Sequence, residues 1–251
     1  MVGAPAVADA VARARTLPRL RVGLHVVLVD GRPILPASAV PDLVDRRGAF
    51  DDNMARAGFR FFFSPTARRQ LAAEIRAQFE AFRATGLVLD HANAHKHMHI
   101  HPTVAGLILS IGRDYGLRAM RVPAEPLGTL RPAAAAEGQR VAPPLYAPWV
   151  ALLRRRLRRA GLVVNDHLLG LAWTGGMTEA RVLRLIEGLP PGLTELYCHP
   201  AVATTPALAR TMPDYRHAEE LAALVSPAVR RLVDRAGIEL IGYGDVPAAG
   251  T

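Results

Sequence analysis

The sequence predicts an α/β protein with a parallel sheet, either open or closed into a barrel. Short β-branched or leucine-rich runs alternate with longer stretches in which apolar residues recur every three or four positions. Such alternation is typical of parallel sheets, because each helix carries the chain back to the start of the next strand. With 251 residues, half of them hydrophobic, the chain can bury one large core, and we predict a single domain over residues 1–251.

Hydrophobic spacing places the individual elements. In the predicted helix at residues 65–85, for example, Leu71, Ile75 and Phe79 share one stripe. Residues 125–159, rich in Pro, Ala and Arg, are predicted to form an insertion over one face of the domain. Helices are predicted at residues 6–16, 65–85, 103–115, 176–188 and 217–236. Strands are predicted at residues 20–29, 87–91, 118–122, 194–198 and 238–243.

Composition argues against several classes of protein. No window holds the roughly 18 uninterrupted apolar residues that a membrane span needs, and the first residues lack the parts of a signal peptide. The single cysteine, Cys198, excludes an internal disulfide framework and fits a reducing compartment. A net charge of +9 suggests nucleic acid, but Lys96 is the only lysine among 31 cationic residues, a bias typical of GC-rich genomes. Basic and aromatic residues do not interleave as in single-strand binders. We therefore predict a cytoplasmic protein that does not bind nucleic acid.

Five of the nine histidines fall within residues 91–101. Neutral imidazole is the commonest metal ligand in proteins. In an extended strand the five rings would be spaced by about 6.6 Å, too far apart to share one ion with bonds of about 2.0–2.1 Å. If the backbone coils after His91, His95 becomes a neighbour of His99, and His97 of His101. In either case one or two of them bind a metal directly, and the alternative is a solvated polar loop before a helix.

Polar side chains follow several predicted strands at their carboxyl ends. These ends meet on one face of a parallel sheet or barrel, where such folds build their sites. Taken singly, His25 and His199 also fit the alternative of a buried, hydrogen-bonded histidine. The residues in question are His25, His91, His95, Arg121, His199 and Asp245.

Two apolar segments allow more than one interpretation. As a helix, residues 148–159 place Trp149, Leu152, Leu153 and Leu157 together among arginines, a pattern that suits an anionic membrane surface. A solvated helix or an oligomer contact is the alternative. Residues 58–65, rich in phenylalanine, form either core or a hydrophobic wall near the site.

Three motifs together resemble the YdjC-like carbohydrate deacetylases, and most closely the branch associated with hopanoid biosynthesis. They are Gly23-Leu24-His25, the run from His91 to His99, and Cys198-His199-Pro200-Ala201. The resemblance covers essentially the whole chain. It implies a distorted (β/α) barrel, a divalent metal (Mg²⁺ in most members, Zn²⁺ in some) and removal of acetyl groups from N-acetylated sugars. By motif, His25 and His95 are the metal ligands.

The resemblance also implies roles for other residues and for partners. His199 stabilises the oxyanion or protonates the leaving amine, while Arg121 and His97 bind the substrate. The expected substrate is an N-acetylated sugar or a glycolipid, such as an N-acetylglucosaminyl lipid of hopanoid biosynthesis. We further expect peripheral contact with the inner membrane and a homodimer.

One departure from the family pattern concerns its first motif. The family begins with a strand that ends in Asp-Asp-Phe-Gly, whose aspartates supply a metal ligand and the catalytic base. By this resemblance we expect the chain to begin after that point, without the family's first strand and helix, as either a start codon assigned too far downstream or a degenerate gene would explain. Asp90 is not favoured as a substitute, because it alternates away from His91. The alternatives to a deacetylase are an inactive truncated homologue and a basic protein that binds a membrane surface or nucleic acid.

Overall fold

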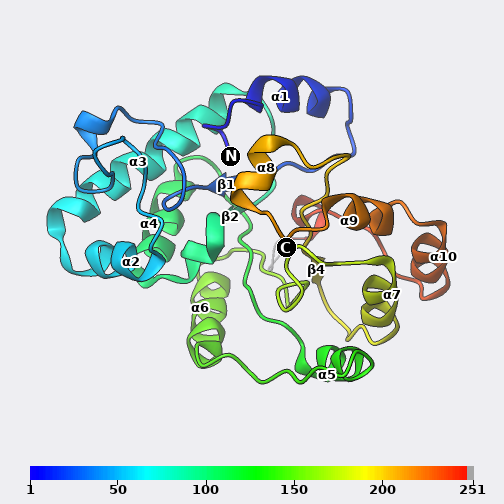
Figure 1. The fold of residues 1–251 in the computed structure, drawn as a ribbon. Coiled ribbons are helices and arrows are strands. Elements are labelled where there is room, and N and C mark those ends of the chain that lie inside the picture. Colours follow the sequence, from blue (N-terminus) through cyan, green and yellow to red (C-terminus); the bar gives the residue numbers. More distant parts are fainter. Residues whose placement is uncertain (248–251) are drawn as a thin grey trace. The chain divides into compact units, whose positions relative to one another are not determined.

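The computed structural model describes residues 1–247, which group into two compact units (Figure 1). The first unit comprises Met1–Arg121, Leu153–Val164 and the segment from Gly242 onward. The second unit comprises Val122–Leu152 and Asn165–Ile241. Helices and parallel strands alternate, which confirms the mixed α/β class, while closure into a barrel and the single domain stay predictions.

The first unit is built on a parallel sheet with helices packed beside it. Its elements are α1 (Val7–Arg15), β1 (Leu24–Val26), α2 (Met54–Phe63), α3 (Pro65–Ala84), β2 (Ala92–Ala94) and α4 (Pro102–Arg113). Strand β1 runs parallel to β2 with His25 opposite Asn93, and single bridges extend the sheet from Ala92 to Met120 and from Ala119 to Val163. Leu71, Ile75 and Phe79 of α3 are buried, as the apolar stripe predicts. In Figure 1 helices α2, α3 and α4 lie together beside this sheet.

The second unit repeats this plan on a smaller scale. Its elements are α5 (Leu127–Ala135), β3 (His167–Leu169), α7 (Glu179–Glu187), β4 (Thr194–Leu196), α8 (Pro206–Thr211), α9 (His217–Leu224) and α10 (Pro227–Arg235). Strand β3 pairs in parallel with β4. Leu130 of α5 packs with Leu169, Trp173 and Leu185 in the apolar core of this unit. The segment predicted as an insertion therefore supplies core residues.

Three sequence predictions for secondary structure are wrong. The strand expected at residues 87–91 lies at 92–94 instead, and no strand forms at residues 238–243, where irregular backbone leads into a 3₁₀ turn at 243–245. The helix expected at 217–236 divides into α9 and α10. Proline cannot donate the backbone hydrogen bond that would continue α9, whereas Pro227 suits the first turn of α10, and the Ser226 hydroxyl caps that helix by accepting the Ala228 and Val229 N–H groups.

The apolar side chains of α6 (Ala147–Arg159) do not form a membrane-facing surface. Leu153 and Leu157 are 1% and 0% exposed, whereas Leu152 is 52% exposed. The arginines of this helix thus flank a buried stripe. On α2, by contrast, Phe61 is buried while Phe59 and Phe63 are exposed to solvent.

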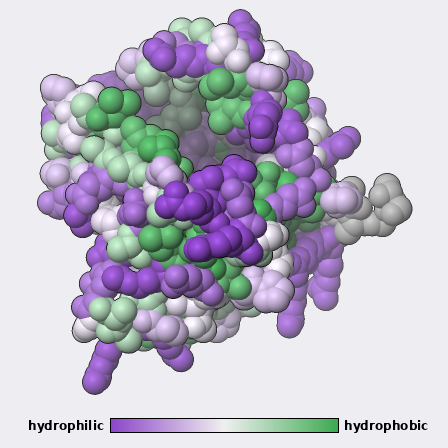
Figure 2. All heavy atoms as spheres, turned by 90° about the vertical axis from the view of Figure 1, so that its right-hand side faces the viewer, coloured by the Kyte–Doolittle hydropathy of each residue, from purple (hydrophilic) through white to green (hydrophobic). Residues whose placement is uncertain are grey.

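Figure 2 shows hydrophilic residues over much of one face of the molecule, with hydrophobic residues in separate patches between them. Among residues 1–247, no helix has the length and apolar character needed to cross a membrane.

Two leucines on α6 test this assignment of its faces. Replacing Leu157 by Ala removes fully buried methyl groups and leaves a cavity, so the free energy of unfolding should fall by about 2–5 kcal/mol. Leu152→Ala on the same helix should change it by less than about 0.5 kcal/mol. Urea denaturation of both variants measures the difference, and equal effects would contradict the assignment.

Candidate functional site

The parallel register of β1 and β2 places His25 against Asn93. The ring Nδ1 of His25 lies 2.5 Å from the amide oxygen of Asn93, which can only accept, so Nδ1–H donates. The proton of a neutral ring is then on Nδ1, and Nε2 keeps a lone pair. Fixing the tautomer of a ligating histidine in this way is the usual task of its hydrogen-bond partner.

A chain of hydrogen bonds continues from Asn93 through His91 to Asp90. The amide nitrogen of Asn93 lies 3.4 Å from Nε2 of His91, whose Nδ1 lies 2.9 Å from the Asp90 carboxylate. Asp90 also accepts the N–H groups of Tyr243 and Gly244. Asp90 therefore orients His91, and the two side chains meet instead of alternating to opposite faces of a strand as expected.

Burial keeps the two predicted metal-binding histidines neutral. It lowers the pKa of His25 to about 3, and it also lowers the pKa of His95. The two ring centroids lie 5.7 Å apart at an interplanar angle of 73°, and Nε2 of His95 is 3.8 Å from a carboxylate oxygen of Asp30. Neutral imidazoles with available lone pairs are the form that binds metal ions.

The remaining histidines of the run have surroundings that differ from one another. His99 is fully buried, and its Nδ1 accepts the Ala94 N–H at 3.0 Å. The His97 ring packs against His99 with centroids 5.7 Å apart, whereas His101 contacts Phe61 and Phe62 of α2. The ring contact is thus between His97 and His99, whereas the spacing predicted His95 with His99 and His97 with His101. The pairs differ because the backbone at residues 96 and 97 is left-handed.

Arg121 lies in the same unit as His25 and His95. It is 8% exposed, and its charge adds to burial in lowering the pKa values of His25 and His99. Its role in substrate binding, like that of His97, stays a prediction. Asp245, by contrast, forms an ion pair with Arg21, which precedes β1, so it lies at the amino end of that strand and not with His25.

The donor set fits two nitrogen ligands of a divalent metal, His25 and His95. No group of three His, Cys, Asp or Glu side chains within residues 1–247 is arranged to hold a metal ion. The pair would supply two of the four ligands of a typical zinc site, with the others left to water, substrate or other groups.

His199 belongs to the second unit, where it follows β4. Its backbone N–H donates to the buried carboxylate of Glu220 at 2.5 Å, and its carbonyl accepts from Nδ1 of His217 at 2.6 Å. Its ring Nε2 lies 2.9 Å from the hydroxyl of Tyr197 and its ring centroid 5.0 Å from that of Tyr215. Backbone and ring are thus both fixed, as a group that handles a proton or an oxyanion requires.

Two residues of the site were missed in the sequence. One is Asn93, which the β1–β2 register places across from His25. Asp30 precedes Gly31 in a dipeptide typical of turns. That signal is typical of a turn, but it does not indicate that the Asp30 carboxylate returns to His95.

Comparison with known proteins identifies the family. A family model for YdjC-like proteins matches residues 1–235, and the chain therefore belongs to the YdjC-like protein family. A carbohydrate deacetylase of Geobacillus stearothermophilus is 29% identical over 245 residues, which are 97% of this chain and 83% of that protein. One from Brevibacillus brevis is 24% identical over 98% of this chain and 86% of its own length.

A shorter match and a solved structure agree with this result. A carbohydrate deacetylase of Vibrio vulnificus is 40% identical over 115 residues, 46% of this chain and 43% of that protein. The crystal structure of an Enterococcus faecalis protein, described as a cellobiose-phosphate cleavage protein, superposes with a TM-score of 0.70 at 22% identity, covering 97% of this chain and 84% of the other. That likeness shows a shared fold. The predicted family is confirmed, whereas the hopanoid branch stays a prediction.

Cys198 gives a test of the second unit that needs no ligand. Burial, together with the nearby Glu220 carboxylate, raises the pKa of its thiol to about 12, so the reactive thiolate at pH 8 should be about a thousandfold scarcer than for an ordinary cysteine. Because Cys198 is the only cysteine, labelling of the native protein by a thiol reagent at pH 8 should be slow and should become fast in urea. Equal rates in the two states would contradict the burial of Cys198 beside Glu220.

Proposed function

We propose that this protein is a metal-dependent hydrolase that removes the acetyl group from an N-acetylated sugar. The observation that carries the proposal is the pair His25 and His95, two neutral imidazoles whose rings lie together, with His25 held in the tautomer that leaves Nε2 available. Membership of the YdjC-like family, and relatives named carbohydrate deacetylases, support the same reaction class.

In this proposal His25 and His95 hold a divalent metal, which when bound polarises the acetyl carbonyl and activates water. Asn93 keeps His25 in the ligating tautomer. Arg121 binds the substrate. His199, with its ring held by Tyr197, stabilises the oxyanion or protonates the leaving amine.

The identity of the metal is open to a direct test. Mg²⁺ is the expectation from the family resemblance, but imidazole nitrogen suits Zn²⁺ better, since Mg²⁺ prefers oxygen ligands. Two histidines without a protein carboxylate ligand would favour Zn²⁺ over Mg²⁺.

The finer expectations remain part of the proposal. They are a lipid-linked substrate of hopanoid biosynthesis, contact with the inner membrane, a homodimer and a cytoplasmic location. The buried stripe of α6 no longer supports a membrane contact, whereas the exposed Phe59 and Phe63 of α2 provide apolar side chains that a lipid could meet.

A second candidate is a metal-binding homologue without catalytic activity. It is favoured by the lack, within residues 1–247, of a third side chain arranged to share a metal with His25 and His95. Both candidate functions predict metal binding, but only the deacetylase predicts turnover of substrate.

Acetate release tests the proposed reaction. Purified protein supplied with Zn²⁺ or Mg²⁺ should release acetate from free or lipid-linked N-acetylglucosamine, and His25→Ala or His95→Ala should abolish release and weaken metal binding, measured by calorimetry. His167→Ala, at a histidine on β3 outside the proposed site, is the matched control and should retain both. Metal binding without acetate from any N-acetylated sugar would favour the inactive homologue.

Asn93→Leu tests the hydrogen bond to His25. Without the amide oxygen the ring is free to take the other tautomer or to turn, so the affinity for Zn²⁺ should fall about 10–100-fold. Circular dichroism and urea denaturation of the metal-free variant establish that it remains folded. Wild-type affinity in a folded variant would show that the bond does not prepare His25 for a metal.

A further inference from the structure

The strained backbone of this protein is concentrated beside His95. Among residues 1–247 the non-glycine residues with positive φ are Asp30 (48°), Lys96 (49°) and His97 (54°). The left-handed region is uncommon for residues with a Cβ, and such strain persists only where the surroundings enforce it. Two of these residues directly follow His95, and the carboxylate of the third lies 3.8 Å from Nε2 of His95.

An ion pair joins the two strained segments. Nζ of Lys96 lies 2.7 Å from Oδ2 of Asp30, the same oxygen that is 3.8 Å from Nε2 of His95. Lys96 is 37% exposed and Asp30 38%, so both are partly shielded from solvent. The only lysine of the chain is thus placed next to a predicted metal ligand.

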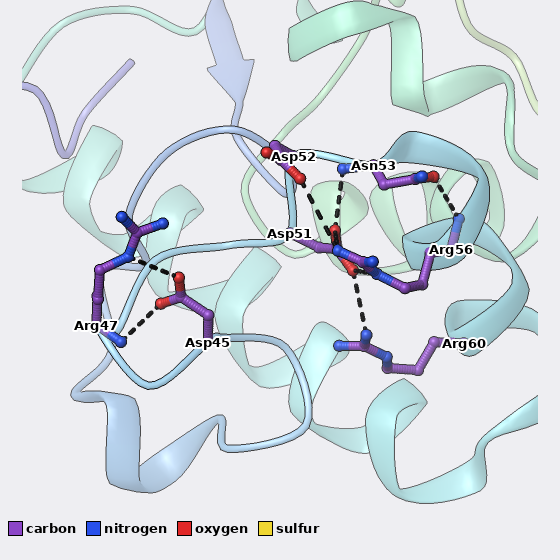
Figure 3. Close-up of polar contacts among 7 residues, drawn as sticks. All are labelled: Asp45, Arg47, Asp51, Asp52, Asn53, Arg56 and Arg60. Carbon is purple, nitrogen blue, oxygen red and sulfur yellow. Dashed lines mark hydrogen bonds and ion pairs between the residues drawn. The ribbon is translucent and has the colours of Figure 1, made fainter.

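A second contact, to Asp51, holds the backbone of Asp30. Its backbone N–H donates to the carbonyl of Asp51 at 3.0 Å, and the Asp51 carboxylate is held by the side chains of Arg56 at 2.6 Å and Arg60 at 3.2 Å (Figure 3). The Asn53 N–H also donates to this carboxylate, at 2.9 Å, at the start of α2. The Asp51 side chain is only 7% exposed. The turn at Asp30 is therefore anchored to helix α2.

We propose that the Asp30–Lys96 ion pair is a positioning device that holds the left-handed turn after His95 and so keeps the His95 ring beside His25. The anchored Asp30 is the fixed partner, and Lys96 is drawn to it. The backbone at residues 96 and 97 then stays in a conformation that it would otherwise leave. The inference rests on the proposed function in that it treats His95 as a metal ligand.

Two other roles for Asp30 agree less well with the geometry. Hydrogen bonding to Lys96 lowers the pKa of Asp30, which makes its carboxylate a weak general base near neutral pH. As a direct ligand it would have to give up Lys96, and within residues 1–247 no three side chains are arranged for a shared ion. An ordinary surface pair, finally, would not account for left-handed backbone at both partners.

Asp30→Asn and Lys96→Met test the proposal in the metal-free protein and with Zn²⁺. Hydrogen exchange of the amides of Ala94 and His101, which donate within this turn, should become at least about tenfold faster in both variants. The affinity for Zn²⁺, measured by calorimetry, should fall about 10–100-fold. Lys96→Arg keeps the charge and should restore most of both quantities.

The matched control is Asp114→Asn, which breaks the Arg76–Asp114 pair elsewhere in the first unit, with N and O 3.0 Å apart and both side chains at least half exposed. It should alter neither exchange near His95 nor affinity for Zn²⁺. Unchanged exchange and affinity in Asp30→Asn and Lys96→Met would overturn the positioning role. A wild-type protein that binds neither Zn²⁺ nor Mg²⁺ would contradict the proposed function, while exchange in the metal-free variants would still decide whether the pair holds the turn.

Discussion

Asn93 stands opposite His25 in the parallel pair of β1 and β2, and its amide oxygen takes the Nδ1 proton of that histidine. Our assignment of His25 as a candidate metal ligand depends on this contact. It decides which ring nitrogen of His25 keeps a lone pair, and it links the strand register to the orientation of a side chain. The next hydrogen bonds agree with this assignment. The Asn93 amide nitrogen donates to Nε2 of His91, and Nδ1–H of His91 donates to the Asp90 carboxylate.

Gly23 shows how closely the backbone is fitted to this arrangement. A Cβ at that position would lie 2.6 Å from the His91 ring, well inside van der Waals contact. The glycine two residues before His25 is therefore required by the His91 ring, which contacts Asn93. On the other side of the site, the turn after His95 is held against its own backbone preference by Asp30 and Lys96. One histidine is thus set by strand register and the other by a strained loop.

Much of this could be predicted from the sequence, and the failures have physical causes. The stripe of Leu71, Ile75 and Phe79 predicted α3 because burial of one helix face repeats locally along the chain. The meeting of strand ends on one face grouped His25 and His95 with four other residues, and only the family resemblance singled out this pair, whose rings lie together in the structure. Asn93 and Asp30 could not be found in this way, because their roles depend on register and on a left-handed turn. The sequence left the role of α6 open, because an apolar stripe among arginines looks the same in sequence whether it meets lipid or a protein core.

The tautomer of His25 is the most direct test of the account. Nitrogen-15 NMR of the metal-free protein near neutral pH distinguishes a ring protonated on Nδ1 from one protonated on Nε2. The structure predicts a neutral ring with the proton on Nδ1, since burial lowers its pKa to about 3 and Asn93 accepts the proton. Addition of Zn²⁺ should then shift the Nε2 resonance. A ring protonated on Nε2, or a charged ring at neutral pH, would contradict the account.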